Sequence, residues 1–494
     1  MGEDLIQIKK DKVNELRKLN IDPYPHKFSI DSYSEKIIKE NSKLKEEEKT
    51  NKKVKIAGRI VSLRPMGKAA FGNLQDSTGR IQFYIKEDNI GEKEYSIFKR
   101  LIDIGDIIGI EGTIFRTKMG EISIWVKKYE LLTKSLRILP EKWHGLQDTE
   151  IRYRKRYIDL IANPKVKETF IIRSKIIKCI RQFLDEKGFL EVETPILQTV
   201  YGGAAAKPFT TFHNELNSDL YLRISPELHL KRLLVGGFEK VYEVSKNFRN
   251  ESIDSFHNPE FTSIELYEAY ADYEYLMKLT EDMLSKILMQ TNGKLEIDYQ
   301  GTKLNFKAPF KRIKFRDLIL KESDIDIDKF RDFETLSNEI RKKKLKEVDI
   351  TKVKHYGALL DELYKRICRP KIIQPTFLID YPVEMIPLAK RNQKDERKVN
   401  IFQLLVNGAE ITKAYDELND PEDQRERLEE QQKLIKKGDE EAQPMDEDFV
   451  EALEYGMPPA GGLGLGIDRL VMLVTNSPSI KEVILFPQMK PEKE

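Results

Sequence analysis

The sequence has very little cysteine: two residues in 494, Cys179 and Cys368, with no Cys-x-x-Cys pair. This argues against a disulfide framework and against a zinc site, because both need clustered cysteines. No apolar run approaches the roughly 18 residues of a membrane span, and the first residues lack the basic region and apolar core of a secretory signal. We therefore expect a cytoplasmic protein that does not enter a membrane.

A large excess of charge of one sign is also missing. Lysine and arginine together number 85, aspartate and glutamate 83, so the formal net charge is only +2. Any nucleic-acid partner would therefore be held by local basic patches rather than by an overall positive field. With 494 residues, 40% of them hydrophobic and 34% charged, the chain predicts two or three globular domains with a heavily charged surface.

Residues 1–52 are rich in lysine and glutamate, and Pro23 and Pro25 interrupt them. Side chains suited to one helix face recur at helical spacing: Leu5, Ile8, Lys12, Leu16 and Leu19. We predict an N-terminal helical segment with one apolar face. Its charged face is either solvated or in contact with a nucleic acid, and solvation is the simpler interpretation.

Between residues 53 and 135 the apolar period changes from helical to strand-like. Short apolar runs typical of strands occur at 54–61, 81–85, 107–112 and 122–126. The stretch 76–79, Asp-Ser-Thr-Gly, has the composition of a hairpin turn. About five short strands in so few residues predict a small closed barrel such as the OB-fold, which commonly binds oligonucleotides.

Residues 136–150 are predicted to be a linker. The remaining chain, 151–494, mixes helical and strand-like patterns without a regular βαβ rhythm, so we predict an α+β domain. An apolar stripe of helical period ends at Gly188 and consists of Ile172, Ile176, Ile180, Phe183 and Leu184. The highly charged stretch 320–350 is predicted to be a surface insertion.

Residues 238–270 predict two strands joined by a polar loop. Counting in steps of two places Glu243 and Arg249 on one face of the first strand, and Phe261 and Glu265 on one face of the second. The opposite faces are apolar. Such a platform suits a nucleotide, because a guanidinium group can clamp a phosphate and a ring can stack on a base.

Residues 461–473 begin with a glycine run and continue as an apolar helix that carries Arg469 in its first turn. Glycines let the backbone approach a ligand, but no Gly-Lys-Ser/Thr follows, so the run is not a P-loop. Tight packing of a strand against a helix explains the run equally well. The helix, strand and proline of 172–197 are, taken alone, explained by an ordinary core.

Together, the stretches 172–197, 238–270 and 461–487 resemble motifs 1, 2 and 3 of class II aminoacyl-tRNA synthetases. The resemblance implies a catalytic domain built on a mainly antiparallel sheet flanked by helices, with motif 1 at a homodimer interface. A preceding OB-fold barrel, which would bind the anticodon, is similar to the subgroup that handles lysine, aspartate and asparagine.

The same resemblance implies an ATP site. Its residues would be Arg249, Glu251, His257, Phe261, Glu410 and Arg469. Arg249, Arg469 and Glu410 would be catalytic, with Glu410 as the ligand of Mg²⁺, a hard cation that prefers carboxylate oxygen. In the family a second metal-site glutamate stands where this chain has Gln403, so we expect a weak ligand there.

Lysine is the expected amino acid, because its ammonium group needs a carboxylate partner when it is buried. Glu227 is predicted to lie exposed at the start of a helix capped by Ser225. By similarity to lysyl-tRNA synthetases, the residues that bind lysine are Glu227, Glu265, Tyr267, Glu417 and Gly203. Any one of these glutamates alone could be an ordinary surface charge, whereas the match of all of them favours a pocket.

Two further positions depart from the family pattern: Lys413 stands where asparagine is usual, and Ile386 where serine is usual. A cation at 413 would repel bound lysine unless it turns away or pairs with Asp416. The lysine pocket is therefore expected to be slightly redrawn.

In the barrel, the resemblance implies anticodon-reading residues at Arg64, Phe71, Gln82 and Glu121. A ring can stack on a splayed base and a glutamine can read a base edge, although Phe71 could instead be a barrel-core aromatic. The expected partners are tRNA(Lys), ATP and L-lysine, with Mg²⁺ as cofactor and a second copy of the chain.

Three other functions remain open. An aspartyl- or asparaginyl-tRNA synthetase is disfavoured by Glu227 and Glu265, which would repel an acidic substrate. A ligase that attaches lysine to a protein is disfavoured by the barrel, because such relatives resemble the catalytic domain alone. A nucleic-acid-binding protein on an inactive synthetase fold is disfavoured by the joint presence of the two phosphate-binding arginines and Glu410.

Overall fold

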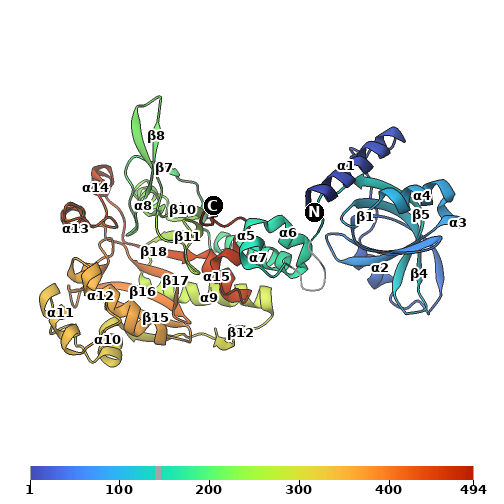
Figure 1. The fold of residues 1–494 in the computed structure, drawn as a ribbon. Coiled ribbons are helices and arrows are strands. Elements are labelled where there is room, and N and C mark those ends of the chain that lie inside the picture. The colour runs from blue at the N-terminus through green and yellow to red at the C-terminus, as the bar shows by residue number, and fades with distance from the viewer. Residues whose placement is uncertain (1, 140–145, 493–494) are drawn as a thin grey trace. The chain divides into compact units, whose positions relative to one another are not determined.

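The computed structural model describes residues 2–139 and 146–492 and divides the chain into two compact units, Met1–Leu146 and Gln147–Glu494 (Figure 1). Part of the predicted linker, 136–150, lies outside the described residues. Within the described ranges, no helix is both long enough and apolar enough to cross a membrane. Both cysteines are free and buried.

The N-terminal unit is a closed barrel with strand order β1-β2-β3-β5-β4, as predicted. In chain order its elements are α1 Gly2–Lys18, α2 Ser34–Glu40, β1 Lys49–Met66, β2 Ala69–Gln75, β3 Arg80–Lys86, α3 Glu87–Ile90, α4 Glu92–Leu101, β4 Ile107–Arg116 and β5 Ile122–Thr133. Alternate strand residues fill the interior, including Val54, Ile56, Ile81, Phe83, Ile85, Ile124 and Val126.

The turn between β2 and β3 confirms the hairpin predicted at 76–79. Asp76 Oδ1 accepts hydrogen bonds from the backbone N–H groups of Thr78 and Gly79, at 2.8 and 3.0 Å. A short side chain that binds its own turn in this way stabilises the reversal of the chain.

Two details of the N-terminal segment, 1–52, differ from the prediction. Strand β1 already begins at Lys49, because the chain pairs with β4 from that residue on. The predicted stripe on α1 is only partly buried: Leu5 and Ile8 are exposed, whereas Leu16 packs in the barrel core. Only the later turns of α1 therefore contribute to that core.

The C-terminal unit is built on an eight-stranded sheet of order β14-β15-β16-β17-β18-β11-β10-β6. Neighbouring strands in this sheet are antiparallel, except that β14 is parallel to β15 and β10 is parallel to β6, as expected for the fold class. The strands are β6 Leu190–Glu191, β10 Lys240–Phe248, β11 Glu260–Ala269, β14 Lys311–Lys314, β15 Thr376–Pro382, β16 Lys398–Val406, β17 Ala409–Asp416 and β18 Ala460–Gly466. Two small sheets are formed by β7 Leu197–Gln198, β8 Phe209–His213 and β9 Ser218–Leu222, and by β12 Glu296–Tyr299 and β13 Thr302–Asn305.

Helices of this unit flank the sheet (Figure 1). They are α5 Thr149–Arg154, α6 Arg156–Ala162, α7 Pro164–Asp185, α8 Glu227–Val235, α9 Tyr273–Asn292, α10 Phe315–Ser323, α11 Phe333–Lys342, η1 Ile350–Lys352, α12 Tyr356–Leu363, η2 Tyr364–Cys368, η3 Arg369–Lys371, η4 Val383–Met385, α13 Pro421–Lys436, α14 Glu447–Glu454, α15 Ile467–Val474 and α16 Ile480–Val483. Helices α7, α9 and α15 share one apolar core with the sheet. The predicted helical stripe before Gly188 is confirmed on α7.

The pairing of β10 with β11 confirms the predicted platform. Glu243 lies opposite Glu265, and Val244 opposite Ile264. Val244 and Ile264 pack on the core shared with α7 and α9, so the faces of Glu243 and Glu265 look the other way.

The prediction that 320–350 is merely a charged surface insertion is wrong. The stretch contains the end of α10, all of α11 and the start of η1, and Ile325, Leu336 and Ile340 are buried in a second core with β15 and β16. The many charges occupy the exposed sides of these short elements and obscure the apolar spacing.

Candidate functional site

The floor of the candidate site is a row of residues that crosses the sheet from β16 to β10. In register, the row runs Gln403, Lys413, Gly464, Glu265 and Glu243. Residues directly opposite on paired strands project from the same face, so this row lies on one side of the sheet. That side is opposite the core formed with α7 and α9.

Three predicted lysine-binding carboxylates converge beside this row. Glu227, at the first turn of α8, accepts hydrogen bonds from Lys231 Nζ at 2.7 Å and from the Tyr415 hydroxyl at 2.6 Å. Glu417, 1% exposed, lies 2.5 Å from the same Lys231 ammonium. Glu265 completes the group. The prediction that Glu227 is exposed is wrong, because α8 turns its first residue into the protein, where Glu227 is 5% exposed.

Lys231 was not predicted, although it lies four residues after Glu227, at the spacing of an ion pair on a helix. Its side chain is fully buried between Glu227 and Glu417. Burial alone would lower the pKa of Lys231, but the charges of Glu227 and Glu417 outweigh it and raise that pKa. The ammonium group therefore stays charged and offsets part of the acidic charge.

Glu265 is held by hydroxyl groups rather than by a cation. Ser225 donates a hydrogen bond to its Oε1 at 2.9 Å, and Tyr267 donates to its Oε2 at 3.2 Å. Exclusion of water, reinforced by the charge of Glu227, raises the pKa of Glu265 to about 8. A cation placed beside Glu265 would favour the ionised form of this carboxyl group.

Two glycines are required by the closeness of these groups. A Cβ on Gly462 would lie 1.9 Å from Glu417 Oε1 and 2.5 Å from the ring of Tyr267. Gly203, predicted to bind lysine, has φ +83° and would place a Cβ 2.8 Å from that of Glu227. Its N–H donates to Gln443 Oε1 at 3.1 Å.

The predicted ATP residues lie around the loop between β10 and β11. The Arg249 guanidinium stacks over the Phe261 ring at 5.0 Å. Arg469 donates to the carbonyl of Glu410 at 3.0 Å and lies 3.2 Å from His257 Nε2. Arg249 and Phe261 thus form one contact, and Arg469, Glu410 and His257 form another; the charge of Arg249 acts on Arg469 and connects the two. Glu251 is exposed in the same loop and, within the described residues, forms no hydrogen bond or ion pair with them.

The carboxylate of Glu410 fits a metal that is shared with phosphate, because Mg²⁺ usually takes one or two carboxylates plus phosphate oxygens. Gln403 does not fit. Its Oε1 accepts hydrogen bonds from Tyr364 and Tyr381, at 2.9 and 2.6 Å, and its amide donates to Glu410. Within residues 2–139 and 146–492, no cluster of three or more His, Cys, Asp and Glu side chains could hold a metal.

The two other departures from the family pattern have different surroundings. Ile386 is buried in the second core. Lys413 does not pair with Asp416, whose carboxylate accepts hydrogen bonds from the N–H of Tyr273 and the amide of Asn400. Lys413 is instead half-buried in the floor of the site, with Gly464 between it and Glu265.

The four predicted anticodon-reading residues cluster on the barrel. Phe71 lies opposite Arg64 on one side and Tyr84 on the other, and the two rings are 4.5 Å apart. Gln82 donates to Glu121 at 2.7 Å. Phe71 is not part of the barrel core. This outer face also carries unpredicted rings. The register aligns Tyr84 and Trp125 with Phe71, and the Phe115 ring lies 6.3 Å from that of Tyr84 and 5.3 Å from that of Trp125.

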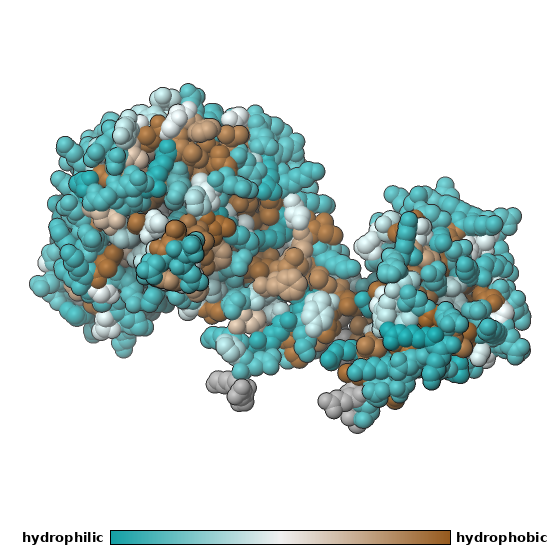
Figure 2. Space-filling model, turned by 90° about the horizontal axis from the view of Figure 1, so that it is seen from above, coloured by the Kyte–Doolittle hydropathy of each residue, from teal (hydrophilic) through white to brown (hydrophobic). Residues whose placement is uncertain are grey.

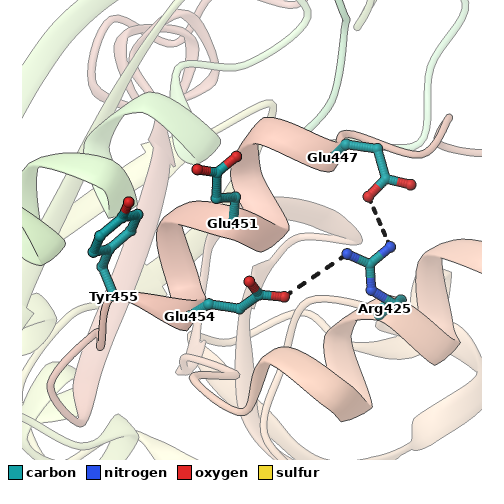
Figure 3. Close-up of a pocket in the computed structure, with 5 residues that line it drawn as sticks. All are labelled: Arg425, Glu447, Glu451, Glu454 and Tyr455. Atoms are coloured by element: carbon teal, nitrogen blue, oxygen red, sulfur yellow. Dashed lines mark hydrogen bonds and ion pairs between the residues drawn. The ribbon is translucent and has the colours of Figure 1, made fainter.

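A separate surface pocket of about 420 Å³ is lined by Arg425, Glu447, Glu451, Glu454 and Tyr455 (Figure 3). Arg425 lies 2.7 Å from Glu447 and 3.8 Å from Glu454. None of the predicted site residues lines it. Its charges are explained by ion pairs that join α13 to α14.

Two known protein families match this chain. The family described as tRNA synthetases class II (D, K and N) matches residues 148–490, and the OB-fold nucleic acid binding domain matches residues 54–132. The chain is a class II tRNA synthetase. As a member of this family it is an ATP-dependent aminoacyl-tRNA ligase.

Relatives of this class II synthetase match it over nearly its whole length. The lysine–tRNA ligase of Pelotomaculum thermopropionicum is 51% identical over 490 residues, which are 99% of this chain and 96% of that protein. The lysine–tRNA ligase of Carboxydothermus hydrogenoformans is 51% identical over 488 residues, 99% of this chain and 98% of the relative. That of Aquifex aeolicus is 53% identical over 444 residues, 89% of this chain and 74% of the relative.

Proposed function

We propose that this synthetase is a lysine–tRNA ligase, which activates L-lysine with ATP and transfers it to tRNA(Lys). The observation that carries the proposal is the convergence of Glu227, Glu265 and Glu417 at one buried place beside the platform. Lys231 offsets only part of their charge, so this place favours one further cation, such as the ammonium group of the substrate. An aspartate-type substrate would add negative charge to the same place, which disfavours that alternative.

ATP binds over the platform of β10 and β11. Phe261 stacks on the adenine ring, Arg249 holds the α-phosphate, and Arg469 holds the terminal phosphate, with His257 beside it. Glu251 reaches the nucleotide from the loop. The lysine carboxylate attacks the α-phosphorus and pyrophosphate leaves, which yields lysyl-adenylate. The nucleophile is already an anion, so the protein contributes position and charge rather than a general base.

Glu410 would hold Mg²⁺ together with phosphate oxygens, and Gln403 would not contribute a ligand. When bound, the metal offsets negative charge on the phosphates. Gln403 orients Glu410 for this role, because its amide donates a hydrogen bond to the Glu410 carboxylate.

The terminal ribose hydroxyl of tRNA then takes the lysyl group, and AMP leaves. The barrel face with Arg64, Phe71, Gln82 and Glu121 reads the anticodon by stacking and edge contacts, each stacked base contributing about 1–3 kcal/mol. A role in charging tRNA for protein synthesis supports a cytoplasmic location.

Lysine-dependent exchange of pyrophosphate into ATP, measured with a panel of amino acids, tests the proposal. We expect exchange with lysine and little with aspartate, asparagine or neutral amino acids. Arg249→Ala should lower the lysine-dependent rate by at least tenfold, because a charge-assisted contact with phosphate is lost. Equal exchange with aspartate, or an unchanged rate in Arg249→Ala, would refute the assignment.

We further propose that the synthetase is a homodimer formed through motif 1. Several apolar side chains in and beside that motif are exposed in the single chain: Ile171, Leu190, Ile196 and Leu197. Apolar areas are visible on the larger unit in Figure 2, and contiguous exposed apolar surface marks interaction sites. Sedimentation should give a mass near twice 57.7 kDa, and Leu190→Glu should reduce it toward the monomer.

A further inference from the structure

Three guanidinium groups lie near one another, because the charges of Arg249 and Arg369 both act on Arg469, which contacts Glu410 of β17. Arg249 and Arg469 were expected to bind phosphate. The third, Arg369, was not predicted and opens η3 directly after the π-helix η2. π-Helical turns are rare and occur mostly at functional sites, so the position of Arg369 needs an explanation.

Backbone contacts bring Arg369 to this place. The N–H groups of Asn407 and Gly408, in the turn between β16 and β17, donate to the carbonyls of Ile373 and Ile372, each at 2.8 Å. A Cβ on Gly408 would lie only 3.6 Å from the Arg369 carbonyl. The segment that carries Arg369 is therefore fixed against the turn that leads directly into Glu410.

The side chains extend this connection. The backbone N–H of Arg369 donates to the carbonyl of Tyr364, which closes the π-helical turn. The Tyr364 hydroxyl binds Gln403, and Gln403 binds Glu410. Arg469 donates to the carbonyl of Glu410 as well. Arg469 thus contacts Glu410 directly, whereas the segment of Arg369 is linked to it through Tyr364 and Gln403.

Arg369 and Arg249 lack partners in the same way. In each, Nε is buried without a hydrogen-bond partner, and neither guanidinium forms an ion pair with any described residue. A buried charged donor without a partner is costly, so such groups are retained where a ligand completes them. Arg366, only three residues before Arg369, is by contrast exposed and paired with Glu362.

The charges also influence one another. Arg249 and Arg369 are the positive charges that act on Arg469, and Glu410 and Asp254 are the negative ones. Like charges held this close destabilise one another unless an anion binds between them. Two carboxylates, Glu410 and Asp254, do not balance three guanidinium groups.

We propose that Arg369 is a third phosphate-binding arginine of the active site, which contacts a phosphate oxygen of ATP or of the departing pyrophosphate. The inference rests on the proposed function for the place of ATP. Arg369 adds positive charge next to Glu410, where Gln403 offers no metal ligand. Nucleotide binding therefore depends less on a divalent cation than it would at a site with several carboxylates.

The test is nucleotide binding to the full-length protein by calorimetry, in EDTA and in Mg²⁺. We expect Arg369→Gln to weaken ATP binding in EDTA about tenfold to a hundredfold, the usual loss for a charged hydrogen bond. Adenosine binding should be unchanged, and Arg369→Lys should restore part of the affinity. Arg366→Gln is the matched control and should bind ATP like the wild type.

Ligands with different phosphates separate the two sources of phosphate. A loss for ATP and pyrophosphate but not for AMP assigns Arg369 to the leaving group, whereas a loss that includes AMP assigns it to the α-phosphate. An equal loss for adenosine, or ATP affinity equal to that of Arg366→Gln, overturns the proposal. The lysine specificity of exchange is measured separately, so failure of the proposed function would be distinguishable: ATP binding would still depend on Arg369.

Discussion

Lys231 has a role that its residue type alone does not suggest. In the lysine-binding site proposed above, an internal lysine occupies the position between two of the expected substrate ligands. It keeps Glu227 and Glu417 close together in the absence of substrate, and it leaves Glu265 as the acidic group without a cationic partner among the three. The substrate ammonium thus enters a site that is already partly neutralised.

Replacing Lys231 by methionine should lower the free energy of unfolding by about 3–5 kcal/mol, because the substitution leaves two buried carboxylates without their cation. Urea unfolding followed by circular dichroism measures the change. Lys278→Met removes an exposed partner of Asp282 on α9 and should cost no more than about 1 kcal/mol. Similar costs for both variants would contradict the role given to Lys231.

Lysine binding should strengthen as the pH rises toward about 8, the pKa of Glu265. Below that pH, Glu265 carries a proton that must leave before its carboxylate can pair with the substrate cation, while the lysine side chain itself stays charged. Glu227 disfavours ionisation of Glu265, and Arg249 favours it. Calorimetric titrations at several pH values measure the trend, and Glu265→Gln should bind weakly with little dependence on pH in this range.

At the scale of single residues, the sequence predicted which carboxylates converge but not what holds them. Glu227, Glu265 and Glu417 come from three distant segments and could be named only through the family resemblance. Lys231 could have been found from its spacing to Glu227. Arg369 could not, because only the pairing of the 372–373 segment with the β16–β17 turn reveals its surroundings.

Among the elements of the candidate site, β18 leaves no room for a side chain at Gly462. Its Gly462 faces the carboxylate of Glu417 so closely that any side chain would displace it. Gly464, two residues on, faces the same side, but a Cβ there would make only an ordinary contact of 3.7 Å with Glu265.

Gly462→Ala should therefore abolish measurable lysine binding and lower stability, because Glu417 or Tyr267 must move out of a packed site. Gly464→Ala should retain lysine binding within about tenfold, since its contact is an ordinary one. Calorimetry with lysine compares the two variants. Equal effects would show that β18 tolerates or rejects side chains for reasons unrelated to Glu417.

Strand pairing was predicted well where polar and apolar residues alternate, as along β10 and β11, and where a turn has a distinctive composition, as at 76–79. The elements within 320–350 were missed because dense charge obscured apolar spacing. The burial of Glu227 was missed for another reason: the direction in which the first turn of a helix faces depends on tertiary packing, here on Tyr415 and Lys231.

At the scale of the whole molecule, the two units have separate hydrophobic cores. The barrel has its own core, and the C-terminal unit has two others, with no residues shared between the units. The family matches divide at nearly the same place, at residues 132 and 148.

We therefore expect a fragment of residues 147–494 to fold and to catalyse lysine-dependent pyrophosphate exchange at a rate within about tenfold of the full chain. Its charging of tRNA should fall much further, because the contacts of Phe71 and its neighbours are lost. Phe71→Ala in the full chain should show the same asymmetry to a smaller degree. A fragment that folds but loses exchange would contradict the independence of the two units.

The same division gives each half of the protein its own freedom to evolve. Substitutions among the outer rings around Phe71 change the barrel surface without changing the residues proposed to recognise the substrate side chain, because the two sets lie in different units. Conversely, the residues at 386, 403 and 413 lie in the C-terminal unit, so substitutions there leave the outer face of the barrel unchanged.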